Sequence, residues 1–273
     1  MIFIEIIKAI ILGIIQGITE WLPISSTGHM IIVNELIPMQ MSAEFVNMFM
    51  VVIQFGSILA VLLLYFSKLN PFAKSKKDPE HFKNTMNLWY KVAIAAVPAA
   101  IIGFLFDDVI DKYLYNSVTV AITLIVYGFA FLWIESRKNK STINSLGQLT
   151  YKTAAFIGIF QVLALIPGTS RSGATILGAV LLGCARPVAA EFSFFLAIPM
   201  MFGASLLKLL KLKVALDFAG IMLLIVGMVT AFVVSIIAIK TFMSYVRKHD
   251  FKVFGYYRII LGVIVLLYFA FLK

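Results

Sequence analysis

Long apolar runs, separated by short polar loops, dominate the chain. Six of them reach the roughly 20 residues that a helix needs to cross a bilayer core. They are Phe45–Phe66, Leu88–Phe106, Val118–Ile134, Glu191–Leu210, Phe218–Ile239 and Val253–Leu272. The alternating ten-residue strands of a membrane barrel are not seen. The pattern therefore predicts an all-α polytopic membrane protein with six transmembrane helices, forming a single membrane domain over residues 1–273.

Two further apolar stretches, Ile2–Leu36 and Thr153–Gly183, carry polar residues at mid-length. These are Gln16, Glu20, Pro23, Ser25, Ser26 and His29 in the first stretch, and Gln161, Pro167, Ser170, Arg171 and Ser172 in the second. We expect each half to be too short to cross a membrane alone. A break at membrane depth is tolerated only where protein or water covers the freed backbone. We therefore interpret both stretches as re-entrant helix–turn–helix segments.

The two interrupted stretches resemble each other. Gly13–Gln16 corresponds to Gly158–Gln161, and Pro23–Gly28 corresponds to Pro167–Gly173 with a one-residue slip. Further along, Glu44-Phe45 and Phe55-Gly56 recur as Glu191-Phe192 and Phe202-Gly203. Each half thus holds one re-entrant segment and three spans. Because three crossings is an odd number, the second repeat (150–273) is expected to be inverted relative to the first (1–135), and the two breaks to meet near the midplane.

The composition agrees with a lipid-facing surface. Hydrophobic residues make up 62% of the chain and charged residues 13%, roughly half the charged fraction of a soluble domain. The net charge is +10, but the basic residues cluster between the spans, so the positive-inside rule accounts for them and nucleic acid is not an expected partner.

Charge also predicts an orientation. If each re-entrant segment returns to its own side, the loops Ser67–Asn87, Glu135–Tyr151 and Lys240–Lys252 share one side. Their basic residues include Lys68, Lys74, Lys76, Lys77, Lys83, Arg137, Lys138, Lys140, Lys240, Arg247, Lys248 and Lys252. The other side has an acidic loop at Asp107–Lys112, although Lys208, Lys211 and Lys213 fit it poorly. The basic side is expected to be cytoplasmic, which places both termini and the first re-entrant segment outward.

In the first interrupted stretch, Gln16 and Glu20 are four residues apart and share a helix face. One interpretation is a pair that only packs helices together. The other is functional, because ionisable groups inside a membrane are costly and usually serve a function. Trp21, next in the chain, is typical of a membrane interface.

Beyond Pro23, Ser25, Ser26 and Thr27 present hydroxyl groups and free amides at the start of the next short helix, where an anion is favoured. Ser25 or Ser26 could instead be a simple N-cap. The N-cap alternative does not explain His29, which lies in the same stretch as an acidic residue and a second hydroxyl residue.

The second interrupted stretch is expected to form a compact anion-binding site. Arg171 lies among glycines and hydroxyl residues, namely Ser170, Ser172 and Thr175. The planar guanidinium fork matches phosphate oxygens. A purely structural ion pair of Arg171 with Glu20 or Glu191 is the alternative, and such a pair could also open for a substrate.

Together, a hydroxyl, an imidazole, a carboxylate and a guanidinium at membrane depth suit phosphoryl transfer. A nucleophile needs an adjacent base, and the transition-state charge needs a cation. A carboxylate can also hold Mg²⁺ beside substrate phosphates. A substrate that reaches such a site from the bilayer would carry a lipid tail.

Two motifs closely resemble the signature segments of the undecaprenyl-diphosphate phosphatases, the bacitracin-resistance family of bacterial membranes. They are Gln16-Gly-Ile-Thr-Glu20-Trp-Leu-Pro-Ile-Ser-Ser-Thr-Gly-His29 and Pro167-Gly-Thr-Ser-Arg-Ser-Gly-Ala-Thr175. The resemblance covers essentially the whole chain. It implies removal of one phosphate from undecaprenyl diphosphate for carrier recycling in peptidoglycan synthesis. It also implies a multi-pass protein of the bacterial plasma membrane with a site that opens to the outer face.

The resemblance also assigns roles. Ser26 is expected to attack the terminal phosphorus with His29 as general base. Arg171, with Ser170 and Thr175, is expected to bind the phosphate, while Ser25, Thr27 and Ser172 are further substrate-binding candidates. Glu20 is expected to hold a divalent cation, Mg²⁺ or else Ca²⁺, with Gln16 as a neutral second ligand. Much of the family has Glu at the position of Gln16, so a two-carboxylate metal site is in doubt here.

Alternatives remain open at this point. A histidine nucleophile or direct attack by water would replace Ser26 if Ser26→Ala kept its turnover and His29→Ala lost it. A lipid-phosphate flippase or transporter is the rival function, since inverted repeats are typical of transporters. A structural membrane partner is the third class, and it would not need Glu20 and Arg171 together in lipid. A homodimer is also considered.

Overall fold

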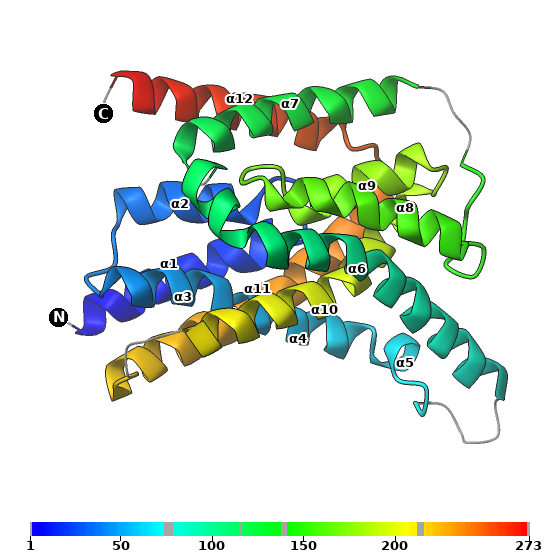
Figure 1. The fold of residues 1–273 in the computed structure, drawn as a ribbon, viewed down its shortest axis with the longest axis horizontal. Coiled ribbons are helices and arrows are strands. Elements are labelled where there is room, and N and C mark those ends of the chain that lie inside the picture. The colour runs from blue at the N-terminus through cyan, green and yellow to red at the C-terminus, as the bar shows by residue number, and fades with distance from the viewer. Residues whose placement is uncertain (1, 74–78, 115, 138–140, 212–215, 272–273) are drawn as a thin grey trace.

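The chain is all-α in the computed structural model, which describes residues 2–73, 79–114, 116–137, 141–211 and 216–271 (Figure 1). The helices are α1 (Ile2–Thr19), α2 (Ser26–Leu36), α3 (Ala43–Val52), α4 (Gln54–Leu64), α5 (Phe66–Leu69), α6 (Pro79–Leu114), α7 (Ser117–Ser136), α8 (Tyr151–Val162), the 3-10 turn η1 (Leu163–Leu165), α9 (Arg171–Leu181), α10 (Arg186–Lys211), α11 (Phe218–Val246) and α12 (Lys252–Phe271). Within these residues the one β-type pairing is an isolated bridge between Ile143 and Cys184.

Seven helical stretches of the described chain are long and apolar enough to cross a membrane. They are Ile2–Thr19, Ala43–Leu64, Pro79–Phe106, Ser117–Ser136, Arg186–Leu210, Phe218–Val246 and Lys252–Phe271. Six of them correspond to the expected spans. The seventh, α1, has 18 residues, so the expectation that each half of an interrupted stretch is too short is wrong for this half. Its helix continues through Gln16 because a single amide does not interrupt helical hydrogen bonding.

Helices extend further than the apolar runs. α6 covers 36 residues and continues to Leu114, so the predicted loop at Asp107–Lys112 is helical instead. The sequence between Phe106 and Leu114 contains no glycine or proline, and charge alone does not end a helix. α11 similarly continues past the predicted end at Ile239 to Val246.

Both interrupted stretches return to the end at which they begin. After α2, the carbonyl of Pro38 accepts a hydrogen bond from Lys8 Nζ (2.6 Å), and Gln40 N donates to Glu5 Oε2 (3.0 Å). After α9, the carbonyl of Gly183 accepts hydrogen bonds from the amides of Thr142 (2.9 Å) and Ile143 (3.0 Å), which precede α8. These contacts support the re-entrant interpretation, which stays a prediction.

Equivalent helices of the two halves make equivalent contacts. α1 packs against α11 and α8 packs against α6, while α7 and α12 pack against each other. A Cβ atom on Gly13 would lie 2.8 Å from the Gly227 carbonyl oxygen, and one on Gly158 would lie 2.4 Å from that of Ala95. The halves are therefore packed alike, which supports the predicted repeats at 1–135 and 150–273.

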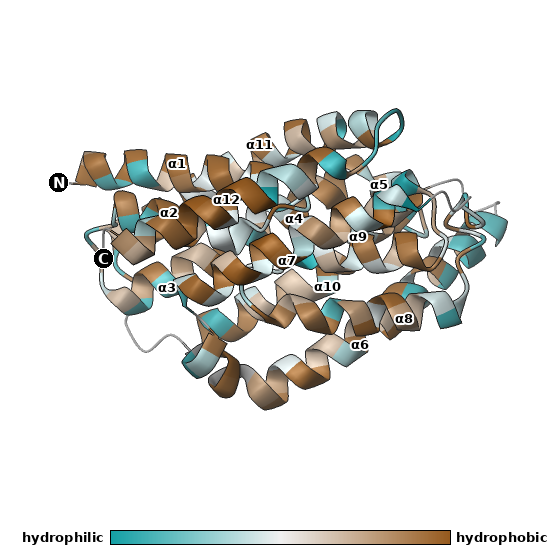
Figure 2. Cartoon of the chain, turned by 90° about the horizontal axis from the view of Figure 1, so that it is seen from above, coloured by the Kyte–Doolittle hydropathy of each residue, from teal (hydrophilic) through white to brown (hydrophobic). Residues whose placement is uncertain are grey.

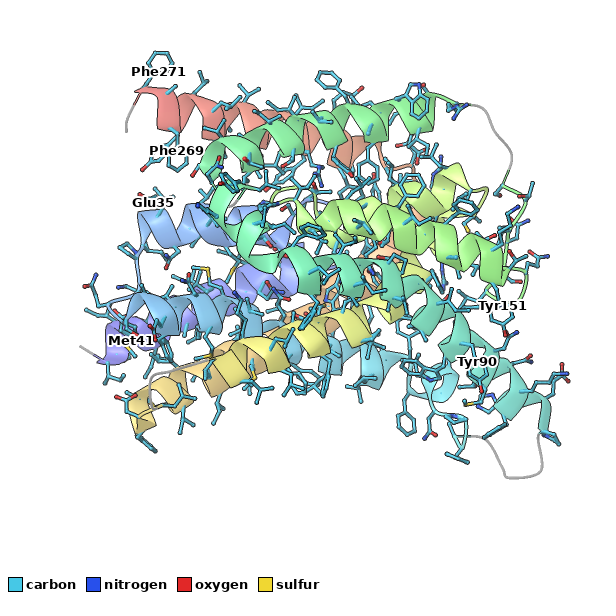
Figure 3. All side chains as sticks on the ribbon, in the orientation of Figure 1. Glu35, Met41, Tyr90, Tyr151, Phe269 and Phe271 are labelled. Carbon is cyan, nitrogen blue, oxygen red and sulfur yellow. The ribbon has the colours of Figure 1, made fainter. Side chains whose placement is uncertain are left out.

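The three basic loops lie at the same end of the bundle. Tyr151 Oη donates to Asn87 Oδ1 (2.6 Å), and Glu135 accepts from Arg186 and from the Phe251 amide. Figure 3 shows Tyr90 and Tyr151 at this end and Glu35, Met41 and Phe271 at the other. Among the basic residues used for the orientation, Lys74, Lys76, Lys77, Lys138, Lys140 and Lys213 lie outside the described residues, and the side chain of Lys211 is not described.

The outer faces of the long helices are apolar. On α12, the exposed side chains include Tyr256, Ile260, Ile264 and Leu267, whereas Arg258 is buried. Figure 2 shows hydrophobic residues along the helices and hydrophilic ones concentrated near α5 and the loops. Lipid contact accounts for this surface, and the chain is a multi-pass membrane protein.

Gly56→Ala is expected to destabilise the protein, because its new Cβ atom would lie 2.0 Å from the backbone oxygen of Met228 on α11. Overpacking of this kind costs about 1–3 kcal/mol. The matched control is Gly203→Ala at the corresponding position of the second repeat, where no atom lies within 4 Å of the added Cβ. Thermal unfolding in detergent should show a lower midpoint for Gly56→Ala alone; equal midpoints would contradict the close α4–α11 contact.

Candidate active site

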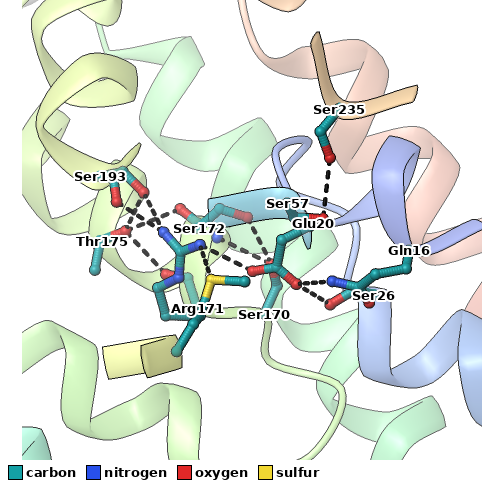
Figure 4. A network of polar contacts seen from close by, with 12 residues as sticks. Gln16, Glu20, Ser26, Ser57, Ser170, Arg171, Ser172, Thr175, Ser193 and Ser235 are labelled. Carbon is teal, nitrogen blue, oxygen red and sulfur yellow. Dashed lines mark hydrogen bonds and ion pairs between the residues drawn. The ribbon is translucent and has the colours of Figure 1, made fainter. Parts of the chain in front are cut away.

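A buried ion pair joins the two breaks. Arg171, the first residue of α9, donates from Nη2 to Oε1 of Glu20, which follows α1, at 2.8 Å. The side chains of Arg171 and Glu20 are only 13% and 6% exposed. The structure thereby brings together the acid of the first break and the guanidinium of the second (Figure 4). Glu191, the alternative partner for Arg171, instead pairs with Lys68 at the basic end.

The second oxygen of Glu20 is also occupied. Oε2 accepts a hydrogen bond from Ser26 Oγ (2.7 Å) and another from Gln16 Nε2 (3.0 Å) (Figure 4). Gln16 and Glu20 therefore share a helix face as expected. The carboxylate is the centre to which Gln16, Ser26 and Arg171 all donate.

Arg171 has further partners that sequence reasoning missed. Its Nη1 donates to the carbonyl oxygen of Ser193 on α10 (2.7 Å), and the Ser193 hydroxyl lies 2.7 Å from that of Thr175. The guanidinium also lies 5.8 Å from the ring centre of Trp21. Trp21 is fully buried and packs edge-on against Phe194, so its expected place at a membrane interface is wrong. A tryptophan beside a buried cation gains a cation–π contact.

Two serines cap the helices that begin after the breaks. Ser25 has φ of 74° and its hydroxyl accepts from the Gly28 amide (3.2 Å); Ser170 has φ of 72° and its hydroxyl accepts from the Gly173 amide (3.1 Å). Each serine lies nine residues after Gln16 or Gln161, so these positions align without the predicted one-residue slip. The N-cap interpretation is therefore correct for Ser25, whereas the Ser26 hydroxyl is directed to Glu20 instead.

The remaining hydroxyl residues differ in their surroundings. Ser172 Oγ donates to the Leu22 carbonyl in the first break (3.1 Å), which ties the two breaks together. Thr175 Oγ1 donates back to the Arg171 carbonyl (2.9 Å) and is fully buried. Thr27 lies half-buried in the first turn of α2.

His29 is held one turn into α2. Its Nδ1 lies 2.7 Å from the Ser25 carbonyl oxygen, and its Nε2 lies 2.7 Å from the hydroxyl of Tyr257 on α12, whose ring stacks on the imidazole. Because a carbonyl oxygen only accepts, Nδ1 carries a proton and the neutral ring accepts at Nε2. Ser26 hydrogen-bonds to Glu20 rather than to His29 in this arrangement. Tyr257 lies far from the motifs in sequence, and no local pattern indicated it.

Gln16 and Glu20 carry oxygen atoms of the kind that bind a divalent cation, although both Glu20 oxygens accept hydrogen bonds in this arrangement. Oε1 of Gln16 is buried and has no hydrogen-bond partner, and it lies on the residue that donates to the Glu20 carboxylate. Mg²⁺ typically uses one or two protein oxygens and takes its other ligands from water and substrate phosphates. Across the described part of the chain, no group of three His, Cys, Asp or Glu residues could enclose a metal by itself. These residues thus suit a cation that arrives with a phosphate ligand.

Comparisons with known proteins cover nearly the whole chain. Residues 9–264 match the model of the family described as bacitracin resistance protein BacA. The undecaprenyl-diphosphatase 1 of Clostridioides difficile (strain 630) is 61% identical over 97% of this chain and 96% of its own length. The undecaprenyl-diphosphatases of Acetivibrio thermocellus and Enterococcus faecalis are 60% and 56% identical, and each alignment covers 97% of this chain and at least 97% of the relative.

Glu20→Gln is expected to lower the unfolding midpoint strongly, because it leaves Arg171 buried and without its counter-charge. Breaking a buried pair typically costs about 3–5 kcal/mol. Adding Arg171→Met should recover part of this loss, and a double-mutant cycle in detergent measures the coupling. As a control, Lys68→Gln removes a partner that is 54% exposed and should change stability little. Equal effects at both pairs would contradict a buried ion pair between the breaks.

Proposed function

The chain belongs to the bacitracin resistance protein BacA family, and from this premise we propose that it is an undecaprenyl-diphosphatase. It hydrolyses undecaprenyl diphosphate to undecaprenyl phosphate and inorganic phosphate, which returns the lipid carrier to peptidoglycan synthesis. The observation that carries this proposal is the buried contact of Glu20 with both Arg171 and Ser26. This contact places a cation, an acid and a hydroxyl at one point inside an apolar bundle.

Substrate binding exchanges the partner of Arg171. The polyprenyl tail stays in the bilayer while the diphosphate reaches the two breaks. The guanidinium, already anchored by the Ser193 carbonyl, then binds phosphate oxygens in place of Glu20. Ser170, Ser172 and Thr175 surround this end, and Ser25 and Thr27 line the start of α2 as further substrate-binding candidates.

Once Arg171 binds the substrate, the Glu20 carboxylate no longer accepts its hydrogen bond and can take up a proton at Oε2. Glu20 Oε2 already accepts a hydrogen bond from the Ser26 hydroxyl. We therefore assign the role of general base in the first step to Glu20 rather than to His29. The Ser26 oxygen bonds to the terminal phosphorus, and the bond from that phosphorus to the bridging oxygen breaks. Undecaprenyl phosphate leaves, and water then cleaves the phosphoserine and releases phosphate.

His29 acts in the second step in this proposal. Its Nε2 is the basic nitrogen, and it faces the Tyr257 hydroxyl one turn from Ser26. A water molecule that attacks the phosphoserine needs a base that Glu20, protonated in the first step, no longer supplies.

A divalent cation would be held by Glu20 and by Gln16 Oε1, with the diphosphate supplying further oxygens. When bound, it neutralises charge on the phosphate oxygens. Mg²⁺ is the proposed ion, with Ca²⁺ as the alternative.

The basic loops support a sidedness proposal. The end that holds Arg137, Arg247 and Lys248 is proposed to be cytoplasmic in the bacterial plasma membrane. α1 begins and α2 ends at the opposite end, which supports the proposal that the site opens to the outer face. A homodimer is the proposed oligomeric state.

The purified protein in detergent should release inorganic phosphate from undecaprenyl diphosphate; a pure lipid flippase would release none. Ser26→Ala and Arg171→Lys should each lower kcat/KM by about 100-fold or more, because one removes the nucleophile and the other removes the planar fork. His29→Ala should let a radiolabelled phosphoserine accumulate. Near-normal turnover of Ser26→Ala together with an inactive His29→Ala would favour a histidine nucleophile or direct attack by water.

Gln16→Glu should shift the dependence on divalent cation. Two carboxylates side by side repel each other unless a cation lies between them, so this variant should bind Mg²⁺ more tightly. We expect half-maximal activity at a Mg²⁺ concentration about tenfold lower than for the unmodified protein. Gln161→Glu, the corresponding change in the second repeat, is the control and should leave the concentration unchanged. An unchanged Mg²⁺ response in Gln16→Glu would remove Gln16 from the proposed metal site.

A further inference from the structure

Arg258 on α12 is fully buried and contacts both breaks. Its Nη1 donates to the Pro23 carbonyl in the first break (3.0 Å), and its Nη2 donates to the carbonyls of Gly168 and Thr169 in the second (both 2.9 Å). Neither signature motif contains this residue, and it lies 235 residues from Pro23 along the chain.

The contacts of Arg258 are not those of an ordinary ion pair. Among the described residues no carboxylate forms a salt bridge with it, and its guanidinium lies 5.3 Å from the ring centre of Tyr127. A buried charge of this kind is costly unless its donors are satisfied. Here the acceptors are carbonyl groups that the breaks release from helical hydrogen bonding. These carbonyls satisfy the two Nη atoms of Arg258, whereas its buried Nε makes no hydrogen bond.

Other hydrogen bonds also hold these turns, and Arg258 adds three from one side chain that contacts both of them. Thr123 on α7 donates from Oγ1 to the Pro167 carbonyl (2.7 Å), and Ser172 donates to the Leu22 carbonyl (3.1 Å). The planar fork of arginine suits several fixed acceptors at once, whereas an ammonium group is a compact point charge.

The carbonyls that Arg258 binds lie next to the reacting groups. Pro23 is three residues before Ser26, and Thr169 is two residues before Arg171. Arg258 therefore bridges the two backbone segments that carry the Ser26 hydroxyl and the Arg171 guanidinium. We infer that Arg258 is a positioning residue that holds the two breaks in register for phosphoryl transfer, an inference that rests on the proposed phosphatase activity.

The test is Arg258→Lys, which keeps the positive charge and loses the fork. We expect kcat to fall on the order of 10- to 100-fold, because small displacements of reacting groups cost this much. KM should stay within about threefold, because the buried charge that favours an anion is retained. Lys91→Met is the control: Lys91 is also buried and donates to one carbonyl, that of Leu146 at the basic end, so its kcat should not change.

A second measurement does not depend on activity. With Trp89→Phe and Trp133→Phe as the common background, the emission of Trp21 reports on the first break and its packing against Arg171. Arg258→Lys should shift this emission, and Lys91→Met should not. Absence of phosphate release by the unmodified protein would defeat the proposed function, while the Trp21 shift would still test the positioning.

A normal kcat or an unshifted Trp21 emission in folded Arg258→Lys would overturn the inference. If that variant does not fold, Thr123→Val takes its place. It keeps nearly the same shape and removes the hydroxyl that donates to the Pro167 carbonyl and also lies within hydrogen-bond distance of the Thr119 and Val120 carbonyls of its own helix. It should retain its unfolding midpoint and lose about fivefold in kcat, as expected for one hydrogen bond. Unchanged kcat in Thr123→Val would then overturn the claim that the register of the breaks controls the reaction.

Discussion

The ion pair between Glu20 and Arg171 constrains the whole bundle, because loss of either partner would leave an uncompensated charge in an apolar interior. Each residue lies at a break in its own half of the chain, so the pair forms only if both breaks reach the same place. The packing of α1 against α11 and of α8 against α6 brings them there, and glycines at positions such as 13 and 158 allow the close approach. Fold and chemistry thus depend on one contact.

The energetics of this ion pair explain how it can open when a substrate binds. A buried ion pair contributes little net stability, since desolvation offsets most of the attraction. A phosphate ligand that replaces Glu20 at Arg171 therefore competes with a weak net interaction rather than a strong one. The carboxylate that it displaces already touches Ser26, so binding of the ligand and activation of the hydroxyl are one event.

Hydropathy was sufficient for most of the fold, because lipid contact imposes apolar runs of fixed length on a sequence. It failed at α1, where an amide did not interrupt the helix, and at Asp107–Lys112, where charges were read as a loop. The motifs identified Gln16, Glu20, Ser26 and Arg171 because these residues cluster locally.

The rest of the site could not be found in this way. Ser193 and the adjacent Tyr257 and Arg258 lie in apolar spans outside the two motifs, and only the packing of α10 and α12 against the breaks gives them their partners. Likewise, sequence alone could not decide which of two adjacent serines is a cap, because that depends on backbone dihedral angles.

The left-handed backbone at Ser25 and Ser170 limits how these two positions can vary over evolutionary time. A replacement has to adopt positive φ and still accept a hydrogen bond from the helix, which leaves Asn and Asp and excludes glycine, which has no side-chain acceptor, and β-branched threonine despite its hydroxyl. Ser26 is under the opposite demand, since it needs a hydroxyl but has ordinary helical geometry. Neighbouring serines in one motif are thus expected to accept different sets of substitutions.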